Sequence, residues 1–181
     1  MRAPRTGDGT DEPIRMSPAA RIKPGPGQES VWDYPRPPAV EASDRAVRVE
    51  HGGELVAETH AAIRVLEMAG APVWYLPRDD VRMDLLRPVA EKTTHCEWKG
   101  SATYFDLVVG DQVARNAAWT YERPLPGYEA ITGRIAFYAG RVNAATVDGE
   151  VARPQPGGFY GGWVTDDVVG PFKGEPGTEG W

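Results

Sequence analysis

The alternation of apolar and polar residues in the middle of the chain predicts antiparallel β-strands. It is clearest over residues 101–121, where β-favouring residues flank Gly110-Asp111 and predict a hairpin with a two-residue turn. Counting outward from this turn places Tyr104 opposite Ala117 and Asp106 opposite Arg115. One face then carries two large rings and a charge pair, namely Ala102, Tyr104, Asp106, Arg115, Ala117 and Trp119. The other face is the predicted core face and carries Thr103, Phe105, Leu107, Ala114 and Ala118.

Two further segments have the pattern of hairpins. In residues 45–59, β-favouring residues flank Gly52-Gly53, and a three-residue loop over residues 51–53 brings the apolar side chains together. That register sets Val49 opposite Leu55 and Val47 opposite Ala57. Residues 134–151 predict another hairpin, which turns near Ala139-Gly140.

The segments between these hairpins are less regular. Residues 59–70 predict a short helix, with Thr59 as its cap, Ile63 and Leu66 on one face and Gly70 at its end. Residues 71–77 predict a strand that ends at Pro77. Residues 78–92 indicate a helical turn followed by a loop or strand, and residues 122–133 a connection broken by Pro and Gly.

The composition of the two ends differs from that of the middle. Residues 1–27 are rich in Pro, Gly and charge and predict a disordered leader. Residues 29–41 contain Trp32 and three prolines, which favours an extended strap over the domain surface with Trp32 as anchor or as part of a ligand site. Residues 152–181 are rich in Gly and Pro but also in aromatic residues, so this tail is expected to pack irregularly on a domain spanning residues 28–151.

Composition and charge narrow the classes of function. The 181 residues carry a net charge of −6, which argues against general nucleic-acid binding. An apolar content of 41% is typical of a globular domain. No apolar run reaches the length of a membrane helix, and no secretory signal pattern is visible. We therefore expect a soluble, cytoplasmic protein, and the sequence leaves a homodimer open.

The segment "THCEWKG" at residues 94–100 holds the only cysteine. Cys96 is a candidate nucleophile, but His95 would point to the opposite face of a strand and is poorly placed to activate it. A buried, inert thiol is therefore the preferred interpretation. A single cysteine also excludes a zinc site built on paired C-x-x-C ligands.

Motifs for metal and phosphate chemistry are missing from the sequence. The three histidines show no H-x-x-x-H spacing, and neither a phosphate-binding loop nor a G-x-S-x-G elbow occurs. We predict no metal and no cofactor. What remains is a set of rings with polar partners, which is typical of a small-molecule pocket. Its proposed ligand-binding residues are Trp32, Tyr75, Tyr104, Trp119, Tyr121, Arg115 and Lys99.

Several stretches in combination resemble a bacterial family known as domain-of-unknown-function family 427. They are "ESVWDYPRPP", "WYLPRDDV", "THCEWKGSATY", "AAWTYERPLP", "RIAFYAGRV" and "VDGE", and the tail resembles an extension of actinobacterial members. The resemblance implies a mainly β chain, with a single β-tent domain in which two antiparallel sheets enclose a pocket and at most one or two short helices occur. The family sometimes carries the label nucleotidyltransferase-like, but Asp106 and Asp111 lack the spacing of a carboxylate pair that holds Mg²⁺.

Three hypotheses about function follow. The first is a non-catalytic domain that binds an unknown small molecule in an aromatic-walled pocket. The second is an enzyme that uses Cys96, or an acid/base pair drawn from Asp106, Glu97 and His95. The third is an interaction module that uses the aromatic tail.

Overall fold

The computed structural model describes residues 20–181 and confirms a mainly β chain with several antiparallel sheets. Helical structure within these residues is limited to short 3-10 turns. They are η2 (Val31–Asp33), η3 (Arg78–Asp80), η4 (Met83–Leu85), η5 (Glu129–Ile131) and η6 (Ala139–Arg141). None of the helical segments between residues 20 and 181 is long and apolar enough to span a bilayer.

The longest strands form a four-stranded antiparallel sheet in the order β10-β9-β8-β7. Its members are β7 (Leu86–Cys96), β8 (Gly100–Val109), β9 (Gln112–Thr120) and β10 (Ala136–Phe137). The predicted turn at Gly110-Asp111 is confirmed, because Val109 pairs with Gln112. The predicted register further from the turn is wrong, because Tyr104 pairs with Trp119 and not with Ala117. A bulge between Phe105 and Leu107 shifts the strands, which counting from the turn could not reveal.

A second four-stranded antiparallel sheet has the order β12-β11-β3-β4. It contains β3 (Val47–His51), β4 (Glu54–Thr59), β11 (Ala144–Val147) and β12 (Glu150–Val151). The β3–β4 register also differs from the prediction, since Val49 pairs with Ala57 and Val47 with Thr59. The loop has two residues, Gly52 and Gly53, both at positive φ, and a bulge follows Val49.

The segment expected to be a helix is a strand. β5 (Ala62–Leu66) lies between β2 (Ala39–Ser43) and β6 (Val73–Tyr75) in a three-stranded antiparallel sheet. β-branched Ile63 and Val65 favour extended backbone, and both are buried there. The hydroxyl oxygen of Thr59 accepts a hydrogen bond from the backbone N–H of Ala61 in a local turn instead of capping a helix.

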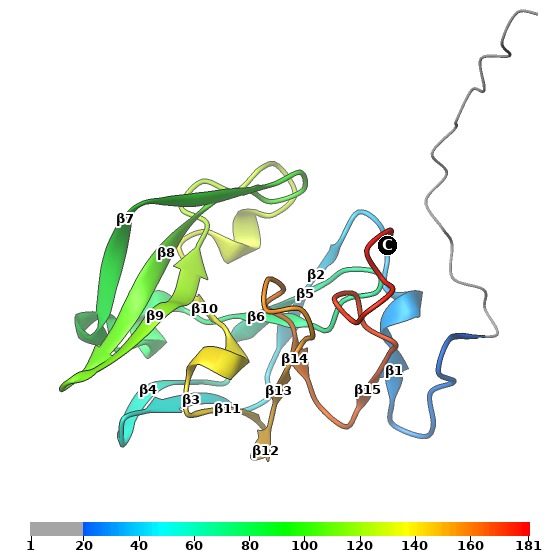
Figure 1. Cartoon of the computed structure of the whole chain (residues 1–181), viewed down its shortest axis with the longest axis horizontal. Coiled ribbons are helices and arrows are strands. Elements are labelled where there is room, and N and C mark those ends of the chain that lie inside the picture. The colour runs from blue at the N-terminus through cyan, green and yellow to red at the C-terminus, as the bar shows by residue number, and fades with distance from the viewer. Residues whose placement is uncertain (1–19) are drawn as a thin grey trace, which may run out of the picture.

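The prediction for residues 134–151 is also wrong about the turn. Residues 139–141 form η6, which joins β10 in one four-stranded sheet to β11 in the other. The hairpin lies further along the chain, where Asp148 and Gly149 join β11 to β12. Both residues have positive φ, as in the favoured two-residue hairpin turns. The segment is thus a crossover between sheets, as Figure 1 shows.

The C-terminal segment lies against the domain and contains short strands. β13 (Arg153–Pro154) pairs with β14 (Trp163–Val164), and β15 (Val168–Val169) runs parallel to β1 (Glu29–Ser30). Both ends of the described chain therefore meet on one side of the molecule (Figure 1). Of the predicted leader, residues 1–19 lie outside the described residues, and the backbone N–H of Ile22 donates to the carbonyl of Gly170.

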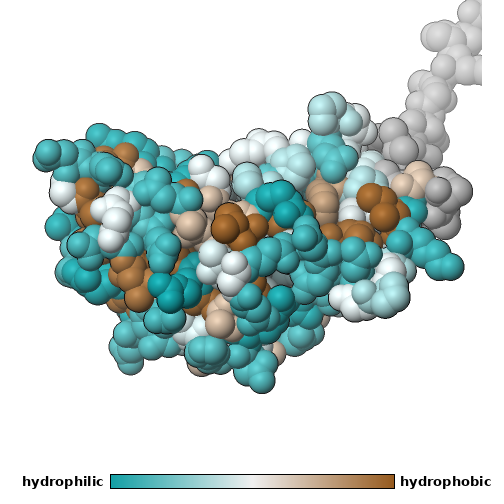
Figure 2. All heavy atoms as spheres, turned by 90° about the horizontal axis from the view of Figure 1, so that it is seen from below, coloured by the Kyte–Doolittle hydropathy of each residue, from teal (hydrophilic) through white to brown (hydrophobic). Residues whose placement is uncertain are grey.

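Side chains of the central sheet alternate between two buried clusters. Phe105 and Leu107 of β8 pack in the cluster shared with the second four-stranded sheet, as the sequence predicted for this face. Tyr104 and Trp119 pack in a second, aromatic cluster with Tyr75 of β6. On the face shown in Figure 2, hydrophobic residues form small separate patches on a largely hydrophilic surface. The rings of Tyr75, Tyr104, Trp119, Tyr121 and Tyr128 are buried together in the aromatic cluster.

Candidate functional site

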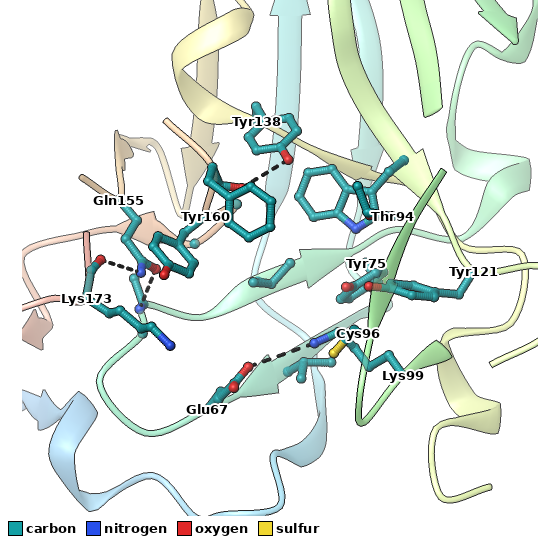
Figure 3. A pocket seen from close by; sticks show the side chains of 18 of the residues that line it. Glu67, Tyr75, Thr94, Cys96, Lys99, Tyr121, Tyr138, Gln155, Tyr160 and Lys173 are labelled. Carbon is teal, nitrogen blue, oxygen red and sulfur yellow. Dashed lines mark hydrogen bonds and ion pairs between the residues drawn. The ribbon is translucent and has the colours of Figure 1, made fainter. Parts of the chain in front are cut away.

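A pocket of about 240 Å³ opens beside the aromatic cluster. Its walls come from β5 and β6, from strands β7, β8 and β9, and from the C-terminal segment, as Figure 3 shows for the labelled side chains. The rings that line it are Tyr75, Tyr104, Trp119, Tyr121, Tyr138, Phe159 and Tyr160. Three separate parts of the sequence therefore meet at one cavity.

Trp119 is the centre of the aromatic wall. Its ring centroid lies 6.3 Å from that of Tyr75 at an interplanar angle of 87°, and 4.6 Å from that of Tyr138 at 49°. Tyr75 in turn lies 6.3 Å from Tyr121. These edge-on and tilted contacts are favourable for aromatic pairs and leave ring faces that do not cover one another.

Burial favours the neutral form of Tyr75, Tyr121 and Tyr138. Burial first, and then the neighbouring Tyr121, raises the pKa of Tyr75 well above its ordinary value. Burial also raises the pKa of Tyr121, and it raises the pKa of Tyr138 to about 12. Near neutral pH each hydroxyl can therefore both donate and accept a hydrogen bond.

Lys99 brings a positive charge to the wall. It sits in the connection between β7 and β8, just before Gly100, whose φ of 98° favours glycine. The residue is only 8% exposed, and its ammonium lies 3.9 Å from the Glu67 carboxylate. That is its single ion pair with any described residue, and the distance is too long for a good hydrogen bond.

The C-terminal segment closes the pocket on a further side. The Gln155 side chain holds it, since the Oε1 atom accepts from the backbone N–H of Ala71 at 3.0 Å and Nε2 donates to the Lys173 carbonyl at 2.8 Å. Lys173 places its ammonium 5.5 Å from the centre of the Tyr160 ring. Gly161 lies directly on Trp119, where an added Cβ would come within 2.1 Å of the indole.

Five of the proposed ligand-binding residues meet at this pocket, namely Tyr75, Tyr104, Trp119, Tyr121 and Lys99. Trp32 and Arg115 do not line it. Trp32 belongs to η2, stacks edge-on with Trp181 at 5.0 Å and donates its indole N–H to the Pro171 carbonyl, so it anchors the strap. The Arg115 side chain is 79% exposed and pairs with Asp106, whose side chain is 14% exposed.

The candidate catalytic groups are only partly brought together. Cys96 is half-buried and lines the pocket, while His95 is exposed and its Nδ1 atom lies 3.2 Å from the Ser101 hydroxyl. Asp106 and Glu97 lie outside the pocket wall, since Asp106 binds Arg115 and Glu97 faces Arg36 at 3.7 Å. Within residues 20–181, no group of three or more His, Cys, Asp or Glu side chains gathers where it could hold a metal ion.

A comparison with family models matches residues 39–148 to a domain of unknown function, DUF427, under the label NTP_transf_9. The chain belongs to this family. No curated protein matches the sequence.

The match ends before several pocket residues of the DUF427 chain. Gln155, Tyr160 and Lys173 follow the matched residues but line the same cavity as Tyr75 and Trp119. Sequence reasoning did not select them, nor Tyr138 or Glu67. The signal for the tail residues was present, because an aromatic-rich tail was expected to pack on the domain, but only the fold shows where it packs.

Proposed function

We propose that the DUF427 domain of this chain binds a small molecule in the pocket around Trp119. The observation that carries the proposal is a cavity of about 240 Å³ walled by rings and by Lys99, a residue that is only 8% exposed. Binding pockets commonly combine apolar walls with a few fixed polar groups. Pockets for drug-sized ligands have volumes of roughly 300–1,000 Å³, so this slightly smaller cavity favours a compact ligand.

The C-terminal segment has a role in this proposal as one wall of the site. Tyr138 donates its hydroxyl to the Phe159 carbonyl at 3.1 Å, and Gly161 allows the loop to lie on Trp119. Phe159 itself remains 66% exposed at the edge of the pocket. A ligand would thus contact both the matched domain and the segment that follows it.

A pocket-filling substitution tests the proposal. Val73 is half-buried and lines the pocket, so Val73→Phe should occupy the cavity, whereas Val113→Phe at an exposed position of β9 should not. We expect at least one compound of a small-metabolite library to raise the Tm of the wild-type protein and of Val113→Phe but not of Val73→Phe. A library without any stabilising compound, or equal stabilisation of Val73→Phe, would contradict binding in this pocket.

The thiol on the same wall supports a second candidate, covalent chemistry at Cys96. A nucleophilic thiol should react with iodoacetamide in the native protein faster than an ordinary free thiol does, because reactivity follows thiolate character and access. A native rate well below that of the unfolded chain would leave Cys96 as a wall residue only. Since the chain has one cysteine, the reaction reports on this position alone.

A further inference from the structure

We infer that the ligand of this pocket is an aromatic carboxylate, with its carboxylate on the Lys99 ammonium and its ring among Tyr75, Trp119 and Tyr121. The inference rests on the proposed function and adds the chemical class of the ligand. It follows from the charges of the wall, from the bonding capacity that Lys99 leaves unused, and from the shape of the aromatic surface.

Lys99 has hydrogen-bonding capacity that its surroundings do not use. An ammonium offers three donors, and among the described residues Lys99 Nζ is not one of the fully buried side-chain atoms that lack a partner, so water can still reach it. Over the described part of the chain, the ammonium makes no hydrogen bond, and Glu67 approaches it only to 3.9 Å. The Glu67 side chain is 42% exposed, so water shares its charge. A ligand oxygen carrying negative charge would replace this water with a charge-assisted hydrogen bond to Lys99.

The charged side chains of the pocket wall also favour a negatively charged ligand. The ionisable side chains other than tyrosine are Glu67, His95, Cys96, Lys99 and Lys173. Two ammonium groups therefore face one carboxylate, while His95 is exposed at the edge. Aromatic cages can also bind quaternary ammonium ions through their ring faces. Here such a cation would share the pocket with the Lys99 ammonium, and like charges repel each other.

The rings define the rest of the ligand. Tyr75 and Trp119 stand nearly perpendicular, at 87°, so a planar guest can meet the face of one ring and the edge of the other. Tyr75 and Tyr121 keep neutral hydroxyls that can bond a polar substituent. With the cavity volume, this favours one ring or two fused rings bearing a carboxylate.

Three probes that differ in charge test the inference by isothermal titration of the full chain. They are 2-naphthoate, its neutral isostere 2-naphthamide, and benzyltrimethylammonium. We expect 2-naphthoate to bind at least about tenfold more tightly than 2-naphthamide, since a charge-assisted hydrogen bond to Lys99 is lost in the amide. In Lys99→Met, which keeps the side-chain length, this ratio should fall close to one. Lys23→Met removes an exposed lysine away from the pocket and should keep the wild-type ratio.

The outcomes separate the ligand class from the proposed function. Equal binding of naphthoate and naphthamide to the wild-type protein, or tighter binding of benzyltrimethylammonium, overturns the carboxylate and leaves pocket binding intact. The same holds if Lys99→Met keeps the preference for naphthoate. If none of the probes binds and no library compound stabilises the protein, both proposals fail. The wild-type ratio decides the point even if Lys99→Met does not fold.

Discussion

Asp106 has a larger structural role than the cross-strand pair that the sequence predicts. One carboxylate oxygen accepts from Arg115 at 3.0 Å, and the other accepts from the backbone N–H of Asn116 at 2.8 Å. Asn116 is the bulge residue at a φ of 49°, a conformation that few non-glycine residues adopt. The carboxylate therefore holds the bulge that sets Tyr104 opposite Trp119.

Substitutions at this pair should have unequal effects on stability. Asp106→Ala removes a charged acceptor from a backbone N–H at the bulge, and we expect a loss of about 1.5–3 kcal/mol in the free energy of unfolding. Arg115→Ala removes an arginine that is 79% exposed and leaves the Asn116 hydrogen bond to Asp106 in place, so it should cost less than about 1 kcal/mol. Urea unfolding of both variants at neutral pH measures the difference. Equal losses would mean that the Asn116 hydrogen bond does not support the bulge.

The loop of residues 157–162 meets the aromatic wall at the Tyr138 hydroxyl, which donates to the Phe159 carbonyl, and most closely at Gly161, which lies on Trp119. An added Cβ at Gly161 would meet the Trp119 ring at 2.1 Å, whereas Gly158 has open space around its Cβ position. Gly158 has a φ of 70°, so alanine there brings backbone strain without a clash. Substitution of Gly161 therefore tests the contact with Trp119, and substitution of Gly158 tests the backbone conformation of the loop.

Gly161→Ala should displace the loop from Trp119 and weaken binding in the pocket. We expect it to lower the affinity for 2-naphthoate by tenfold or more and the free energy of unfolding by about 1–3 kcal/mol, as overpacking does. Gly158→Ala should cost about 1–2 kcal/mol of stability and leave the affinity within a factor of two. Titration calorimetry and urea unfolding give the two quantities. Similar affinities for both variants would show that the loop is not part of the site.

The sequence predicts the strands of residues 101–121 from alternating polar and apolar positions, and the turn at Gly110-Asp111 from its composition. It predicts the strand within residues 71–77 without such alternation, from β-favouring residues that end at Pro77, because Trp74, Tyr75 and Leu76 are all buried. β5 was not predicted as a strand, because Ala62, Ile63, Val65 and Leu66 are all buried and show no period of two. This segment forms a strand because it pairs with β2 and β6. The residue pattern of one short segment gives no information about such long-range pairing.

The predicted registers of two hairpins are wrong for a related reason. In both β3–β4 and β8–β9 a bulge shifts the pairing, and a bulge depends on what packs on each side of the strand. The sequence is enough to propose Tyr104, Trp119 and Lys99 as site residues, because two aromatic residues and a lysine lie on or next to one predicted hairpin. Tyr138 and Lys173 could not, because a crossover and a tail bring them to the pocket.

At the scale of the whole molecule, ion pairs around Arg45 connect parts of the chain that are far apart in sequence. This guanidinium contacts Asp148 at 2.7 Å and Asp167 at 2.6 Å, and so joins the β11–β12 turn to the C-terminal segment. Arg45 holds the pKa of Asp148 below its ordinary value. Burial opposes ionisation of Asp167, but hydrogen bonds from Thr165 and Arg45 outweigh it and lower the pKa of that carboxyl too.

These lowered values predict how stability changes with pH. Because both carboxyls have a lower pKa in the folded chain than in the unfolded one, their contribution is complete above the ordinary value of 3.8 and is lost as the pH falls through the folded-state pKa. Arg45→Met should therefore be less stable than wild type at pH 7, and the gap should close below pH 3.8.

Urea midpoints measured across this range for the wild-type protein and Arg45→Met check the prediction. Arg36→Met, which breaks an exposed pair 3.7 Å long, serves as control and should stay close to wild type throughout. A gap between wild type and Arg45→Met that does not change with pH would rule out the two carboxyls as its source.

A crystal structure of the full chain with 2-naphthoate tests most directly whether the rings around Trp119 enclose a binding site. The expected result is a naphthyl ring in the cavity between Tyr75 and Trp119, with a carboxylate oxygen hydrogen-bonded to the Lys99 Nζ atom. Rings packed against one another with no cavity, or a probe bound only elsewhere on the surface at saturating concentration, would contradict it.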